Sequence, residues 1–311
     1  MSRHIDAREP DRESHGLSRD GRGRGASESM GITDDARDAL TRDLDLPQGP
    51  SREHVRRRSW EGDLRGSEVR VLATAGAFRV VPMDELRRPD DRPHVHRKDV
   101  ERLRGLDLVR TMPSVVGGER TTVVTLTERG RAVLEESRRH RADRPPQAFY
   151  AGVVKPRELA HDACVHRAYR EAAGRLADHG VRVTRVVLEQ DLKREYQAFL
   201  QAPNRGRRTS AGRPQRDADE IARWAHEHAL PMFDGHVHFP DVRLECEGRD
   251  GRRQVEDVEV MTPHYRGAHA AAKVRAGFTR VRAMGARLGG ASGATRAGRG
   301  RDAHLAEEML S

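Results

Sequence analysis

The sequence predicts a mixed α+β protein in which two folded regions lie between disordered ends. Only 35% of the 311 residues are hydrophobic and 34% are charged, so the chain has too few apolar residues to bury its whole length. Apolar residues recur at helical and alternating spacings within 67–145 and 146–283. Pro145-Pro146 separates these regions, because consecutive prolines cannot continue a helix.

The two ends of the chain are rich in charged and small residues. Residues 1–66 combine Arg, Asp, Gly and Ser without a sustained period, so we expect a mostly disordered, charged N-terminal region. A short helix around Asp34–Leu46 is the exception that the spacing of its apolar residues allows. Residues 284–311 predict a flexible tail rich in Gly and Arg.

The first folded region, 67–145, has a pattern of three helices, a two-stranded ribbon and a closing helix. A helix begins at Ser67 and ends at Gly76, and Pro82 suits the first turn of a second, short helix. The expected elements after it are a helix over Arg97–Gly105, strands over Leu108–Met112 and Thr121–Leu126 around Gly117-Gly118, and a last helix capped by Thr127. This order predicts a winged helix-turn-helix domain.

The run LDLVRTMPSVVGGERTTVVTLTERGRAVLEE resembles the wing and last helix of winged-helix DNA-binding proteins. The resemblance implies that the third helix enters the major groove of double-stranded DNA and that the wing contacts phosphates. The region holds 17 basic and 13 acidic residues. The candidate DNA-binding residues are Arg97, Lys98, Arg102 and Arg104 on the helix and Arg120 on the wing. The alternative is that these side chains form a solvated face and the domain binds a partner protein.

The second folded region, 146–283, has the order α-β-α-α-β-β-α and predicts a mixed α/β domain. Its last two strands form a hairpin around Gly248–Gly251. Asp257 and Glu259 lie two apart on the second strand, so both project from one face, and Asp241 stands near the start of the first strand. Three converging carboxylates would suit a hard cation such as Mg²⁺.

Pro240-Asp241 followed by a hairpin and the D-x-E of Asp257 and Glu259 resembles the active-site hairpin of PD-(D/E)xK nucleases. The whole order is similar to the replication-relaxation family of plasmid and mobile-element proteins, in which a winged helix precedes a restriction-endonuclease-like domain. The start of that domain resembles the His161-Asp162 pair of this chain. The resemblance implies catalytic and metal-binding roles for Asp241, Asp257 and Glu259.

One position departs from the nuclease pattern. Glu259 stands where those nucleases carry a lysine, which would stabilise charge that develops on the phosphate. Lys273, on the helix expected after the hairpin, is the candidate to replace that lysine in catalysis, and Glu189 could add a fourth carboxylate. The alternative is a catalytically inactive nuclease fold whose acidic residues line a solvated edge.

We therefore expect a DNA-binding protein of a plasmid or mobile element, which acts in replication, relaxation or mobilisation through Mg²⁺-dependent nicking. The alternative is a non-enzymatic winged-helix regulator whose second domain mediates dimerisation or binds a partner. Expected partners are double-stranded DNA and either a second copy of the chain or replication and relaxation proteins. No uninterrupted apolar stretch approaches the length of a membrane span. The presence of two cysteines and the absence of a secretory signal in the sequence indicate a cytoplasmic protein.

Overall fold

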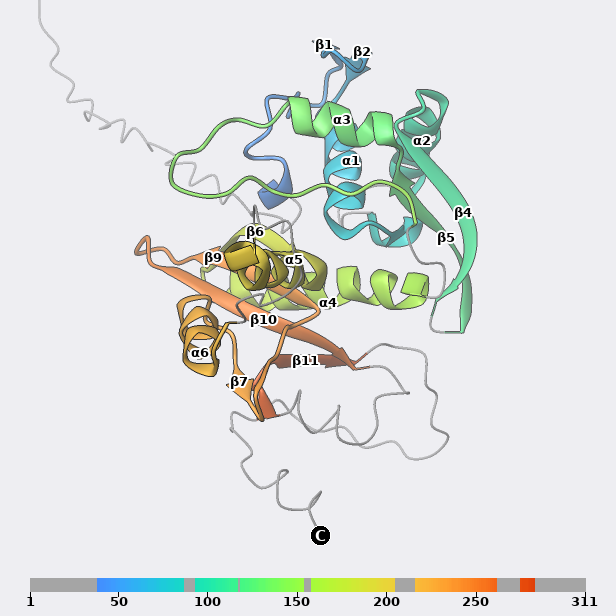
Figure 1. Cartoon of the computed structure of the whole chain (residues 1–311). Coiled ribbons are helices and arrows are strands. Elements are labelled where there is room, and N and C mark those ends of the chain that lie inside the picture. Colours follow the sequence, from blue (N-terminus) through green and yellow to red (C-terminus); the bar gives the residue numbers. More distant parts are fainter. Residues whose placement is uncertain are drawn as a thin grey trace, which may run out of the picture. The chain divides into compact units, whose positions relative to one another are not determined.

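The computed structural model describes residues 38–86, 93–116, 118–153, 158–204, 216–261 and 275–282, all of which belong to one compact unit that begins at Asp34. Helices and strands are mixed along this part of the chain, so the predicted α+β class is confirmed (Figure 1). None of the helices in these ranges is both long and apolar enough to cross a lipid bilayer. The expected tail, 284–311, lies outside the described residues.

The segment before the first long helix is ordered from residue 38. It contains the short helix η1 (Asp38–Leu40) and an antiparallel ribbon of β1 (Glu53–Arg56) and β2 (Glu61–Leu64). The side chains that bury this segment in the core are those of Leu40, Leu44, Leu46, Val55 and Leu64. The prediction of disorder up to residue 66 is therefore wrong for 38–66. Its apolar residues are too irregularly spaced to show a period, yet each one reaches the core.

Two helices precede the first hairpin. Helix α1 (Gly66–Phe78) is buried on nearly every side and extends beyond both of its predicted ends. The two-residue strand β3 (Val81–Pro82) and the short helix η2 (Met83–Leu86) lead to α2 (Pro93–Gly105), which begins four residues before the predicted Arg97. On α2, Val100 and Leu103 are fully buried, as their helical spacing predicts.

The hairpin of β4 (Val109–Val116) and β5 (Glu119–Leu126) joins β3 in a sheet with the order β3-β5-β4. Its strands run closer to the turn than expected, up to the pair Val116–Glu119. Gly118 there has a φ of 84°, a conformation that glycine adopts without strain. Helix α3 (Glu128–Glu136) follows, and Thr127 caps it as predicted, because its hydroxyl accepts a hydrogen bond from Gly130 N at 3.0 Å.

The second region is built on a four-stranded sheet with the order β11-β10-β9-β6. Strands β6, β9 and β10 are antiparallel neighbours, and β11 pairs with β10 in parallel. The elements are α4 (Leu159–Asp178), β6 (Arg182–Leu188), α5 (Glu189–Gln201), α6 (Ala218–Glu227), β7 (Met232–Phe233), β8 (His236–Val237), β9 (Val242–Glu247), β10 (Arg253–Met261) and β11 (Thr279–Arg282). The sequence did not predict β11, and the helix expected between β10 and β11 lies mainly outside the described residues.

Helix α4 connects the two regions. It contacts β10, β6 and β9 on one side and α1, β3 and β4 on the other (Figure 1). A contiguous set of buried apolar residues extends from Leu40 through α1 and α4 to Val281. A buried polar network adds to this connection, since Glu85 of η2 binds His166 and Arg167 of α4 at 2.9 and 2.6 Å.

Candidate nucleic-acid interface and carboxylate hairpin

The outer face of α2 carries three exposed cations. Because Val100 and Leu103 face the core, the side chains of Arg97, Lys98 and Arg104 are directed outward, and all three are exposed. None of the three forms an ion pair with any other residue that the structure describes. A helix that presents three such groups is suited to bind an extended anion.

Arg102, the fourth basic residue predicted for this face, has a different role. Its Nε lies 3.3 Å from Glu68 Oε1, and its Nη2 donates a hydrogen bond to Asp63 O at 3.0 Å. Glu68 is fully buried and also binds Arg52 at 2.8 Å. Arg102 therefore ties α2 to α1 and β2, and its charge is already balanced inside the protein.

The wing candidate is exposed as expected. Arg120 lies on β5 opposite Val115 of β4, next to the turn of the hairpin. Arg120 forms no ion pair within the described ranges, and Val115 is 56% exposed. The tip of the hairpin thus combines one cation with an apolar side chain.

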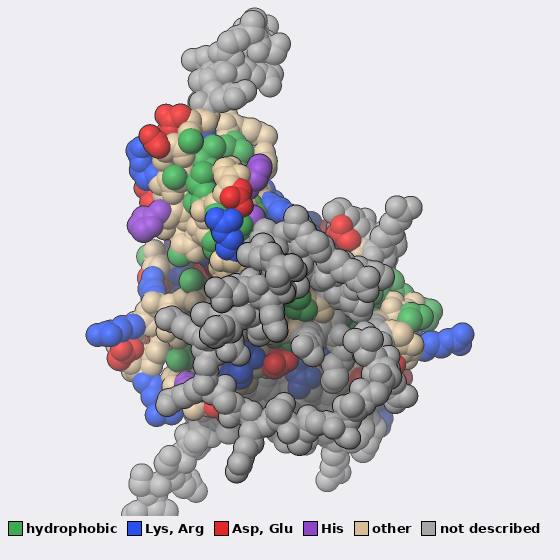
Figure 2. Space-filling view, turned by 90° about the horizontal axis from the view of Figure 1, so that it is seen from below, with side chains coloured by type: hydrophobic (Ala, Val, Ile, Leu, Met, Phe, Trp, Pro, Cys, Tyr) green, Lys and Arg blue, Asp and Glu red, His purple; other side chains and the backbone are tan. Residues whose placement is uncertain are grey.

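Other surfaces of the described protein mix both signs of charge. Figure 2 shows the face that looks downward in Figure 1, where blue and red side chains are interspersed among the residues drawn in colour. On the four-stranded sheet, two arginines of β6 pair with carboxylates of β9: Arg182 with Glu247 at 3.0 Å and Arg185 with Glu245 at 2.8 Å. These strands therefore differ from the outer face of α2, where three exposed cations have no ion pair among the described residues.

In the hairpin of β9 and β10, called here the carboxylate hairpin, Arg243 binds the side chain of Asp257, one of the predicted metal ligands. Strand pairing sets Arg243 of β9 directly opposite Asp257 of β10. The guanidinium donates to both carboxylate oxygens, at 2.7 and 2.8 Å, and also to the carbonyl oxygens of His228 and Ala229. Both side chains are largely buried. This pair was not predicted, although a cross-strand match of opposite charges in the predicted hairpin would have indicated it.

Asp241 is buried at the entrance to β9 and joins three elements. Its Oδ2 accepts a hydrogen bond from Val260 N of β10 at 2.8 Å, and its Oδ1 lies 3.5 Å from His161 Nε2 of α4. The hydrogen bond to this carboxylate raises the pKa of His161. The main-chain oxygen of Asp241 accepts a hydrogen bond from Glu189 N, at the start of α5, at 3.1 Å. Asp241 therefore fixes this end of the sheet, where β9 begins, against α4 and α5.

The remaining predicted site residues do not complete a metal centre in the described part of the chain. Glu259 is 1% exposed, Glu189 pairs with Lys193 at 2.8 Å, and Lys273 lies outside the described residues. Within those residues, no group of three His, Cys, Asp or Glu side chains is placed to hold a metal ion. Arg243 holds both oxygens of Asp257, so in this structure an internal cation occupies the carboxylate with which Asp257 would ligate Mg²⁺.

The two cysteines are packing residues. Cys164 and Cys246 are buried and unpaired. Burial raises the pKa of both thiols, that of Cys246 to about 12. Neither is therefore a thiolate nucleophile at neutral pH.

Comparison with known proteins found no matching protein family, no matching curated protein and no matching solved structure.

Proposed function

We propose that this protein binds double-stranded DNA through α2 and the β4–β5 hairpin. The observation that carries the proposal is the set of three exposed cations on α2, Arg97, Lys98 and Arg104, which have no carboxylate partner among the described residues. Exposed cations of this kind release counterions when they meet a phosphate backbone, which drives binding.

The order of elements supports the same proposal. Helices α1 and α2, the β4–β5 hairpin and α3 follow one another as in a winged helix-turn-helix domain. In that arrangement α2 enters the major groove and the hairpin lies along the backbone, where Arg120 would contact a phosphate. Arg102, held by Glu68 and Asp63 O, positions α2 and is not expected to contact DNA.

For the second region we propose a non-catalytic role, as a platform fused to the DNA-binding elements. The ion pair of Arg243 and Asp257 supports this proposal, because Arg243 binds the carboxylate oxygens that Asp257 would offer to a metal ion. The metal-dependent nuclease is the second candidate, favoured by the place of Asp241 at the entrance to β9 beside the D-x-E strand. A role in plasmid or mobile-element replication or relaxation rests on the resemblance of the sequence alone.

The proposal is tested by the affinity of the full chain for a fluorescent DNA duplex. The variant Arg97→Gln/Lys98→Gln/Arg104→Gln should bind at least about 10-fold more weakly at low salt, because it loses three phosphate contacts. A matched control, Arg223→Gln/Arg249→Gln/Arg280→Gln, removes the same charge from exposed positions of the second region. Equal losses in both variants would show that only net charge matters.

A second assay separates the two candidates for the α/β region. Supercoiled plasmid incubated with the protein and Mg²⁺ should be retarded and remain intact, in wild type and in Asp241→Asn alike. Nicking by wild type that Asp241→Asn abolishes would establish the nuclease instead.

A further inference from the structure

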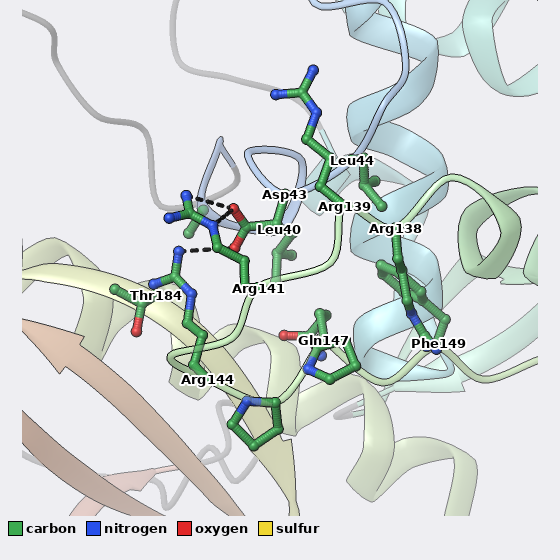
Figure 3. Close-up of a pocket in the computed structure, with 13 residues that line it drawn as sticks. Leu40, Asp43, Leu44, Arg138, Arg139, Arg141, Arg144, Gln147, Phe149 and Thr184 are labelled. Carbon is green, nitrogen blue, oxygen red and sulfur yellow. Dashed lines mark hydrogen bonds and ion pairs between the residues drawn. The ribbon is translucent and has the colours of Figure 1, made fainter.

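A second basic feature lies far along the chain from α2, in a pocket between the segment that holds η1 and the connection from α3 to α4. Figure 3 shows this pocket and the side chains around it. The lining includes four arginines of the connection and one aspartate of the η1 segment: Arg138, Arg139, Arg141, Arg144 and Asp43. Apolar side chains of Leu40, Leu44 and Phe149 form part of its wall.

Asp43 already shows how an anion is bound there. Its Oδ1 accepts from Arg141 Nε at 2.9 Å, and its Oδ2 accepts from Arg144 Nη2 at 2.8 Å. Both guanidiniums are directed toward this carboxylate in Figure 3, whereas Arg139 points away from it. One carboxylate is therefore shared by two arginines.

The positive charge of the pocket is not balanced by the described residues. The buried Nε atoms of Arg138 and Arg144 have no hydrogen-bond partner in the part of the chain that the structure describes. Burial lowers the pKa of Arg138, and neighbouring Arg131 adds to this effect while Glu135 opposes it. The guanidinium of Arg139 lies 3.9 Å from Asp45, and that of Arg138 lies 3.7 Å from Glu135. A further anion would satisfy donors that are left unused.

The backbone that carries these arginines is fixed before any ligand arrives. Arg139 N donates to Asp43 O at 2.8 Å, and Asp45 N donates to Ser137 O at 2.7 Å. Gln147 holds the other end of the connection, since its side-chain amide bonds both Val186 N and Val186 O at 2.9 Å. Such preorganisation lowers the entropy lost on binding.

We propose that this pocket is a phosphate-binding site, in which Arg141 and Arg144 hold the oxygens of a phosphate group and Asp43 competes with it. The planar guanidinium fork matches phosphate as it matches carboxylate, and phosphate carries more charge than Asp43. The ligand is either a free phosphorylated molecule or a backbone phosphate of nucleic acid, which share this chemistry. The site uses none of the α2 residues assigned to DNA.

The test is calorimetric titration of the full chain with inorganic pyrophosphate at low salt. Arg141→Gln/Arg144→Gln should weaken binding by at least about 10-fold, since two charge-assisted contacts are lost. Asp43→Asn should strengthen binding, because the competing carboxylate becomes neutral. Arg139→Gln, on the same segment but directed away from Asp43, should change the affinity far less.

Asp43→Asn is expected to strengthen pyrophosphate binding and Arg141→Gln/Arg144→Gln to weaken it. A general loss of folding would weaken binding in both variants, so it cannot produce this result. The proposal is wrong if neither wild type nor Asp43→Asn binds pyrophosphate, or if Arg139→Gln weakens binding as much as the double variant does.

Duplex affinity of the same variants identifies the source of the phosphate. A double variant that loses pyrophosphate but keeps its DNA affinity indicates a free phosphorylated ligand, whereas parallel losses indicate a nucleic-acid backbone. The α2 triple variant should keep pyrophosphate binding, so failure of the DNA proposal is distinguishable from failure of this one.

Discussion

At the scale of single residues, the first turn of α3 requires a glycine at position 130. Thr127 caps α3, and its hydroxyl also donates to Asp107 O at 2.7 Å, so the start of the helix is drawn against the end of the preceding turn. A Cβ on Gly130 would lie 2.1 Å from Leu108 O, a backbone atom that cannot move aside alone.

We expect Gly130→Ala to lower the free energy of unfolding by about 2 kcal/mol or more, through this overlap. Urea denaturation measures the change. Gly105→Ala is the matched control, because a Cβ there meets nothing within 4 Å. Similar losses in the two variants would contradict the packing explanation.

The pair of Arg243 and Asp257 is the second residue-scale feature. We expect Arg243→Met to destabilise the protein by about 3 kcal/mol, because it leaves a largely buried carboxylate without its cation. Adding Asp257→Leu should recover part of this loss, since the uncompensated charge is then removed. Chemical denaturation at pH 7 gives both values.

The comparison for this prediction is Arg182→Met, which breaks a more exposed pair with Glu247 in the same sheet. That change should cost less than about 1 kcal/mol. If Arg243→Met lowers the free energy of unfolding no more than Arg182→Met does, the buried pair of Arg243 and Asp257 does not stabilise the fold.

At the scale of elements, the sequence predicts best those segments whose apolar residues follow one period. The spacing of Val100 and Leu103 identified α2, and the turn signal Gly117-Gly118 between two strand-like runs identified the hairpin of β4 and β5. The pattern of apolar residues could not identify the ribbon of β1 and β2, where Val55 and Leu64 are buried among charged neighbours. Strand β11 was missed because its four residues are too short for a period.

The carboxylate hairpin shows the limit of site prediction from sequence. Register about Gly248–Gly251 correctly set Asp257 and Glu259 on β10 and Asp241 at the entrance to β9. The predicted site rested on acidic residues alone and did not include Arg243. Likewise the partner of Arg102, Glu68, lies 34 residues away, so only the folded chain shows that this arginine is engaged.

At the scale of the whole described molecule, α4 joins the two regions through a buried charge network. Burial alone would raise the pKa of Glu85, but the hydrogen bonds and charges of His166 and Arg167 outweigh it and lower that pKa. A carboxylate with a lowered pKa in the folded state stabilises the protein above its unfolded pKa. That contribution is lost as the pH falls through the folded value.

We therefore expect Glu85→Gln to reduce the free energy of unfolding at pH 7 by about 1–3 kcal/mol. The difference from wild type should shrink as the pH falls from 4.5, the ordinary pKa of a glutamate, through the lower folded pKa, below which Glu85 is protonated in both states of the wild type. Urea unfolding across this range provides the test. Glu171→Gln, an exposed change on α4, should have little effect at any pH. A Glu85→Gln penalty that stays constant with pH would contradict the assignment.

The central claim is that α2 places Arg97, Lys98 and Arg104 against the phosphates of a DNA duplex. Its most direct test is the salt dependence of duplex affinity for wild type, the α2 triple glutamine variant and the control triple variant of the second region. The slope of log affinity against log salt should become shallower by about 2–3 in the α2 variant, because about 0.9 is lost per phosphate contact. The control should keep the wild-type slope. An α2 variant with the wild-type slope would contradict the claim and place the DNA contact elsewhere.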